Sequence, residues 1–224
     1  MEQSLFQRSR SLRISPAGSP ESRRYQPVKI PPLARTSEPR QILHFDIETR
    51  LVGFHKGGRF APDGCEPIAM AWMVPGEEVR VSSMGSKWRK GDLVLMLEEF
   101  REAYDAADMV TGHYVLKFDL PVINGAMLEF GREPLSPKLV SDTKVHLFRR
   151  AAVSASQENL ALMRRVEAAK MKMSDTDWRE AARLTQEGIG KARDRVEADV
   201  EQHHQLRTSL IENNYLRSPS VWRS

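Results

Sequence analysis

Apolar residues in this chain occur first in short runs and later in longer periodic stretches. Short apolar runs bounded by glycine and proline are typical of buried strands. Five such runs predict strands, at residues 42–47, 67–74, 78–82, 109–111 and 139–141. Apolar positions that recur every three or four residues predict amphipathic helices. These occur at residues 93–107, 120–130, 160–163, 174–184 and about 185–212.

This order of elements predicts an α/β fold. Three strands precede the first helix, and strands then alternate with helices, which indicates a mixed five-stranded sheet flanked by helices. Residues 1–40 contain seven serines and six prolines without apolar periodicity, so we expect a disordered basic tail. The folded domain is expected at 41–215, followed by a short C-terminal tail at 216–224, from which Trp222 can dock on the domain. A capping-box pattern at Ser154 and Gln157 marks the start of the third helix.

Composition narrows the classes of protein that remain. The chain has 224 residues, 40% of them hydrophobic, which is enough for one domain with a core. Its single cysteine excludes an internal disulfide and fits a reducing compartment. Without a long apolar span or an apolar leader, we expect a soluble cytoplasmic protein with no membrane partner. Residues 1–40, with eight basic and three acidic residues, carry a net charge of +5, and the rest of the chain carries −1, so the whole chain has a net charge of +4. That tail can attract phosphates, or it can be solvated with no partner.

The first candidate site lies at the end of the first strand. Asp46 and Glu48 are two residues apart, so both side chains project from the same face of that strand. Two neighbouring carboxylates repel each other, and burial increases the cost unless a cation neutralises them. Mg²⁺ and Mn²⁺ prefer oxygen ligands of this kind. The alternative is that the strand ends at Asp46 and water solvates both carboxylates.

A second candidate lies on the last helix. Its inward stripe has successive spacings of three and four residues, over Ile189, Ala192, Val196, Asp199, His203, Leu206 and Leu210. An aspartate in the middle of such a stripe is costly unless it is paired or bound to a metal. Asp199 is therefore a candidate metal ligand, or it forms a salt bridge with a buried arginine. His203 is either a catalytic residue or a core histidine with a satisfied partner.

A third carboxylate, Asp119, begins the second helix and by itself is an ordinary N-cap. Together, however, the three places resemble the DEDD, or DnaQ-like, 3′–5′ exonucleases of the ribonuclease H-like superfamily. Their three motifs are similar to residues 45–49, 112–119 and 196–200, with 142–143 and 156–160 similar to the stretch between the last two. The resemblance covers residues 41–212 and implies the ribonuclease H-like fold.

By this resemblance, Asp46, Glu48, Asp119 and Asp199 hold two ions of Mg²⁺ or Mn²⁺ and form the catalytic set, with Thr49 approaching the terminal nucleotide. The implied reaction is metal-dependent 3′–5′ exonucleolytic hydrolysis of DNA, in replication or repair, alone or with a polymerase in trans. Three alternatives stay open. They are an RNA-directed exonuclease, an endonuclease on the same fold, and a catalytically impaired nucleic-acid-binding protein.

The chain departs from the family at two places. Where the family often has asparagine after Gly-His, this chain has Tyr114. The family also places a tyrosine four residues, or a histidine five residues, before the last aspartate, where it orients the attacking water. Those positions are Arg195 and Asp194 here, and neither is a suitable general base. His203, one turn after Asp199, is the candidate replacement, ahead of His44 and His113.

Overall fold

A mixed sheet organises the part of the chain that the computed structural model describes, which is residues 40–52, 62–148, 153–168 and 171–223. Within these residues the sheet has six strands in the order β3-β2-β1-β4-β5-β6. The strands are β1 (Ile42–Leu51), β2 (Cys65–Met73), β3 (Arg80–Ser83), β4 (Met109–Gly112), β5 (Lys138–Asp142) and β6 (Ser220–Trp222). β1 pairs with β2 antiparallel and with β4 parallel, and β4 and β5 are also parallel.

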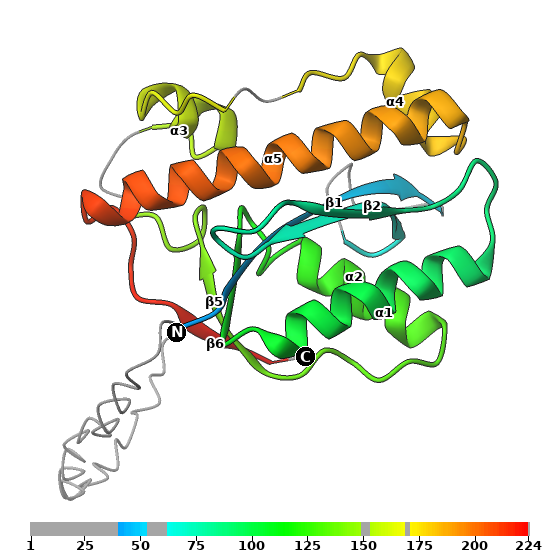
Figure 1. Cartoon of the computed structure of the whole chain (residues 1–224), viewed down its shortest axis with the longest axis horizontal. Coiled ribbons are helices and arrows are strands. Elements are labelled where there is room, and N and C mark those ends of the chain that lie inside the picture. Colours follow the sequence, from blue (N-terminus) through cyan, green and yellow to red (C-terminus); the bar gives the residue numbers. More distant parts are fainter. Residues whose placement is uncertain (1–39, 53–61, 149–152, 169–170, 224) are drawn as a thin grey trace, which may run out of the picture. The chain divides into compact units, whose positions relative to one another are not determined.

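Helices cover both faces of this sheet. They are α1 (Lys90–Ala106), α2 (Asp119–Glu129), α3 (Gln157–Met163), α4 (Asp175–Ala182) and α5 (Gln186–Glu212). The long α5 lies across β1 and β2 on one side, whereas α1 and α2 lie on the other side (Figure 1). This mixed α/β arrangement is compatible with the ribonuclease H-like fold predicted from the sequence. Among the described residues, every helix is too short or too polar to cross a bilayer.

The side chains of β1 alternate between the two layers. Phe45 faces α1, where its ring lies 5.0 Å from that of Phe100, and Phe100 in turn contacts Trp72 and Tyr104. All four aromatic side chains are buried, and they form the centre of the larger core. Because successive residues of a strand point to opposite faces, Asp46 and its neighbours at even positions turn away from this core towards α5.

The predicted boundaries of α5 are close to the observed ones. The expected start at about Thr185 is correct, because the Thr185 hydroxyl accepts a hydrogen bond from the Gly188 amide at 3.1 Å and caps the helix. The capping box expected at Ser154 and Gln157 is wrong. Ser156 caps α3 instead, accepting from the Asn159 amide at 3.3 Å, and Gln157 is the first helical residue.

The predicted count of five strands is also wrong, because β6 adds a sixth to the described sheet. β6 lies within residues 216–224, which we expected to be a tail, and it pairs antiparallel with β5. Trp222 packs against the larger core, and Leu216 forms an isolated bridge with Leu147. A strand of three residues is too short to show a periodic pattern in the sequence. β6 can therefore be recognised only from its pairing with the edge of β5 in the folded structure. The expected tail at 1–40 lies, apart from Arg40, outside the described residues.

Candidate active site

On the face of β1 that turns towards α5, three successive side chains each lie against one residue of that helix. The His44 ring contacts His203, a carboxyl oxygen of Asp46 lies near one of Asp199, and Glu48 pairs with Arg195. These three pairs are called the β1–α5 ladder below. Two residues of a strand rise by about 6.6 Å, and four residues of a helix rise by about 6.0 Å. Because these two rises are nearly equal, successive pairs stay aligned along β1 and α5, which run antiparallel.

Three carboxylates of the ladder converge. Asp46, Glu48 and Asp199 each offer one oxygen, and these oxygens all lie within 4.8 Å of one another. Glu48 and Asp199 are buried, whereas Asp46 is half-buried. Oxygen donors gathered at this distance suit a hard divalent cation such as Mg²⁺ or Mn²⁺. The cluster could therefore hold a metal ion, and the site predicted for these three residues is geometrically possible.

The cluster already contains a cationic side chain, which the sequence did not place there. Arg195 Nε donates to Glu48 Oε1 at 2.5 Å, and Arg195 Nη2 lies 3.6 Å from Asp199 Oδ2. Burial lowers the pKa of this guanidinium, but Glu48, Asp199 and Asp46 more than offset that effect, so its pKa is raised. The alternative that Asp199 pairs with a buried arginine is thus realised in part. Arg195 stands at the position where the family places its water-orienting tyrosine.

Asp119 lies beside this cluster without belonging to it. Its side chain is buried at the first residue of α2, where backbone hydrogen bonds come from its own segment and from Ile47. Burial, with the carboxylates of Asp142 and Glu48 nearby, raises the pKa of Asp119 to about 8. Of the four predicted ligands, three therefore converge closely in the described structure, and Asp119 remains an adjacent carboxylate.

A buried carboxylate that the sequence analysis did not assign to the site shapes the loop before Asp119. Asp142, at the end of β5, accepts backbone hydrogen bonds from Tyr114 at 3.0 Å and Leu116 at 3.0 Å. It also accepts from Lys144 and Val145, each at 2.9 Å. Tyr114 has a φ of 73°, a left-handed conformation that asparagine adopts more readily than tyrosine. Asp142 thus holds the loop in place at the position where the sequence departs from Gly-His-Asn.

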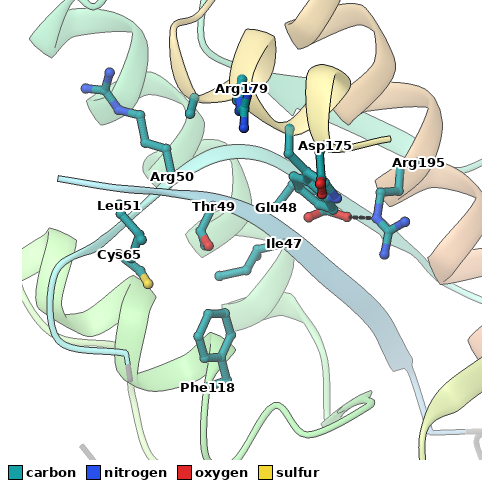
Figure 2. Close-up of a pocket in the computed structure, with 12 residues that line it drawn as sticks. Ile47, Glu48, Thr49, Arg50, Leu51, Cys65, Phe118, Asp175, Arg179 and Arg195 are labelled. Carbon is teal, nitrogen blue, oxygen red and sulfur yellow. Dashed lines mark hydrogen bonds and ion pairs between the residues drawn. The ribbon is translucent and has the colours of Figure 1, made fainter. Parts of the chain in front are cut away.

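A pocket of about 710 Å³ opens beside the carboxylates. Glu48 and Arg195 form part of its wall, Ile47 and Phe118 lie on one side, and Asp175 and Arg179 lie on the other (Figure 2). Its apolar and aromatic lining includes Trp178, whose ring lies 5.0 Å from the centre of the Arg195 guanidinium. Pockets of this size and lining accommodate molecules as large as a nucleotide.

Thr49, the residue expected near a terminal nucleotide, lines the same pocket. The register of β1 against β2 shifts between Glu48 and Thr49, whose partners on β2 are Ala69 and Pro67, so Ile68 is the extra residue. The bulge therefore lies on β2, opposite these two residues. Both Glu48 and Thr49 line the pocket.

His203 lies at the opposite end of the ladder from Arg195. It is buried, and its Nδ1 lies 3.2 Å from Nδ1 of His44, so one ring donates and the other accepts. The His44 ring also contacts the ring of His204. Neither His203 nor His113 belongs to the cluster of converging ligands among the described residues. This arrangement favours the interpretation of His203 as a core histidine with a hydrogen-bond partner, rather than as a catalytic residue.

We expect this histidine pair to make the fold sensitive to acid. Burial, together with His204 and Arg207, lowers the pKa of His44 from 6.5 to about 3, and burial lowers that of His203 well below 6.5. At a pH between the lowered pKa of each histidine in the folded chain and its ordinary pKa of 6.5, the unfolded chain binds protons that the folded chain does not. Each such proton lowers the free energy of unfolding by about 1.4 kcal/mol per pH unit. Stability is therefore lost as the pH falls below about 6.5.

The measurement is urea unfolding between pH 4 and 7 for the wild type and for the double variant His44→Leu/His203→Leu. The wild type must be compared with the variant because Asp119 affects stability in the opposite direction. With its raised pKa, Asp119 contributes to the free energy of unfolding at low pH, and this contribution is lost as the pH rises. The variant should lose less stability on acidification, by up to about 1.4 kcal/mol per pH unit for each histidine. Parallel curves for the two proteins would show that these histidines are not held neutral by the fold.

The fold of this chain is similar to that of a solved structure. A family B DNA polymerase from the hyperthermophilic archaeon Pyrobaculum calidifontis is similar to this chain, with a TM-score of 0.55 and 14% sequence identity. The match covers 78% of this chain and 25% of the polymerase chain, so this chain spans about a quarter of that protein's length. No protein-family model matches the sequence. No curated protein matches it either. At this level of identity the likeness concerns the fold alone.

Proposed function

We propose that this chain is a metal-dependent 3′–5′ exonuclease that hydrolyses phosphodiester bonds of DNA. The observation that carries the proposal is the convergence of Asp46, Glu48 and Asp199 within 4.8 Å beside a pocket of about 710 Å³. A group of acids that repels phosphate is of little use to a protein that only binds nucleic acid. With a divalent cation, the same acids become a site at which a phosphodiester can be bound and cleaved. The 3′–5′ polarity rests on the resemblance in sequence.

The donor set fits Mg²⁺ or Mn²⁺. All three converging groups are carboxylates, which are the ligands that these hard ions prefer, and Asp119 offers a fourth from the side. In this proposal Asp46, Glu48 and Asp199 hold the metal, with Asp119 completing the set. When bound, the metal would act as a Lewis acid on the phosphate and lower the pKa of a coordinated water.

The other pocket residues have binding roles in this proposal. Phe118 and Trp178 offer aromatic faces for a terminal base, and such stacking tolerates any base. Thr49, next to Glu48 on β1, lines the same pocket, and in this proposal it contacts the terminal sugar. Arg195 supplies a guanidinium beside the position of the phosphate, where its planar shape matches two phosphate oxygens. In this proposal these residues hold the terminal nucleotide of a strand, as an exonuclease requires.

A second candidate function is a nucleic-acid-binding protein with impaired catalysis. The observation that favours it is Arg195, which replaces the family's water-orienting residue and forms an ion pair with Glu48. In this alternative, Arg195 reduces the negative charge enough for phosphate to bind without cleavage. The two functions differ in whether bound nucleic acid is shortened.

The deciding experiment incubates the protein with single-stranded DNA, duplex DNA and RNA, each labelled at its 5′ end. Mg²⁺, Mn²⁺ or EDTA is added in parallel. We expect DNA to shorten stepwise from its 3′ end with either metal, and to stay intact with EDTA. The variant Asp199→Asn, purified in the same way, should leave DNA intact and so excludes a contaminating nuclease. Binding without cleavage under every condition would overturn the proposal in favour of the second candidate, and faster cleavage of RNA would reassign the substrate.

A further inference from the structure

We propose that the guanidinium of Arg195 takes the place of one of two metal ions, so that this site binds a single divalent cation. The inference rests on the proposed function, because it assumes that the carboxylates of the β1–α5 ladder bind a metal. It replaces the two-ion arrangement that the resemblance implies. The observation behind it is that the cationic group lies between two of the expected ligands, Glu48 and Asp199.

The contacts of Arg195 hold the guanidinium in this position from several sides. Nε donates to Glu48 Oε1 at 2.5 Å, and Nη1 donates to the carbonyl oxygen of Met171 at 2.8 Å. The centre of the group lies 5.0 Å from the ring of Trp178, and the side chain is only 14% exposed. An arginine held by two hydrogen bonds and an aromatic ring loses all of them if it swings away. We therefore treat Arg195 as a fixed part of the site rather than as a gate that a metal displaces.

The formal charges of the site agree with one ion. With Asp119 beside them, the three converging carboxylates bring the formal charge to −4 when all are ionised, which two divalent cations would balance. Arg195 reduces this charge to −3. Two divalent cations would then leave an excess of positive charge in a half-buried site, whereas one would not.

The position of Arg195 also suggests what it contributes to the substrate. Among the described residues, its Nη2 lies 3.6 Å from Asp199, and the side chain lines the pocket. A guanidinium carries five donors, stays protonated, and matches phosphate oxygens in pairs. The donors not engaged by Glu48 and Met171 can therefore contact the phosphate, which is the task that a second cation has in a two-ion site.

The test measures how many Mn²⁺ ions bind to the full chain, without nucleic acid, by titration calorimetry and by the electron paramagnetic resonance of free Mn²⁺. We expect one ion per chain for the wild type and two for Arg195→Gln. The matched control is Arg193→Gln, which removes the same charge two residues earlier on α5. Arg193 is exposed and hydrogen-bonded to Ser83, so this control should bind one ion as the wild type does.

Each outcome separates this inference from the proposed function. Equal numbers of ions in the wild type and in Arg195→Gln would overturn the inference, as would a gain of one ion in Arg193→Gln. Two ions in the wild type would overturn it even if Arg195→Gln did not fold. Zero ions in the wild type and one in Arg195→Gln would overturn the metal-dependent function and, with it, the inference that the wild-type site binds one ion. Zero ions in all three proteins would overturn both.

Discussion

Replacing Asp46 with asparagine is expected to slow DNA cleavage by about a thousandfold or more while leaving the fold intact. Asparagine has nearly the shape of aspartate but no negative charge, so the cluster with Glu48 and Asp199 would hold a divalent ion less tightly. Metal-ion catalysis contributes several kcal/mol to phosphoryl transfer, and about 4 kcal/mol corresponds to a thousandfold change in rate. The measurement is the initial rate of shortening of 5′-labelled DNA at saturating Mg²⁺.

The matched control for Asp46→Asn is Glu201→Gln, two residues after Asp199 on the exposed side of α5. It removes the same charge from the same layer without touching the converging oxygens, so its rate should stay within about twofold of the wild type. Both variants should melt within a few degrees of the wild type. Equal rates for Asp46→Asn and the wild type would remove Asp46 from the site, and equal losses in both variants would indicate a general effect of charge.

Replacing Asp142 with alanine is expected to lower the free energy of unfolding by about 3–5 kcal/mol, because four backbone amides lose their acceptor at once. The left-handed conformation of Tyr114 would also lose the hydrogen bond that helps to hold it. For a domain of this size, the melting temperature should fall by roughly 6–20 °C. Thermal unfolding followed by circular dichroism gives this value directly.

The control for Asp142→Ala is Asp108→Ala, which removes one acceptor from an exposed amide, that of Gln41. Water can replace that acceptor, so the cost should stay below about 1 kcal/mol. A loss of similar size in both variants would mean that the loop of residues 113–118 does not depend on Asp142. If Asp142→Ala melts lower but folds, its cleavage rate should fall as well, since this loop leads directly into Asp119.

The carboxylates of Asp46 and Asp142 differ in the groups that surround them. Asp46 is part of the acidic cluster, whose charges repel one another and need a cation. Asp142 is also acidic and, unlike Asp46, it is fully buried, but backbone amides surround its carboxylate and satisfy it locally. Two aspartates of one sequence can therefore have different roles, and the groups that surround each of them, which the sequence does not give, distinguish the two.

Local periodicity was enough to predict the layers of this fold. The stripe of α5 from Ile189 to Leu210 placed Asp199 and His203 on its inward face, and both are buried. The spacing of Asp46 and Glu48 placed both carboxylates on one face of β1, and that face meets α5. The period of a helix or strand is set by its own backbone, so a single segment of sequence is sufficient to identify the inward side.

Periodicity did not predict what each inward residue meets. The pairing of Glu48 with Arg195, and of His44 with His203, depends on how far α5 is shifted along β1, about 150 residues away in the sequence. A shift of one helical turn would exchange these partners without changing either pattern. The four-residue step put Arg195 on the same side as Asp199, but only the docked helix shows the guanidinium between two carboxylates.

The sequence by itself thus determined the mixed α/β class, the inward faces of β1 and α5, and the acids that those faces carry. The tertiary structure alone decided that three of these acids converge, that Asp119 stands beside them, and that Arg195 is already among them. It also decided that β6 completes the described sheet. The reason is physical: the side on which a residue lies follows from its own segment, whereas its partners follow from the packing of distant segments against each other.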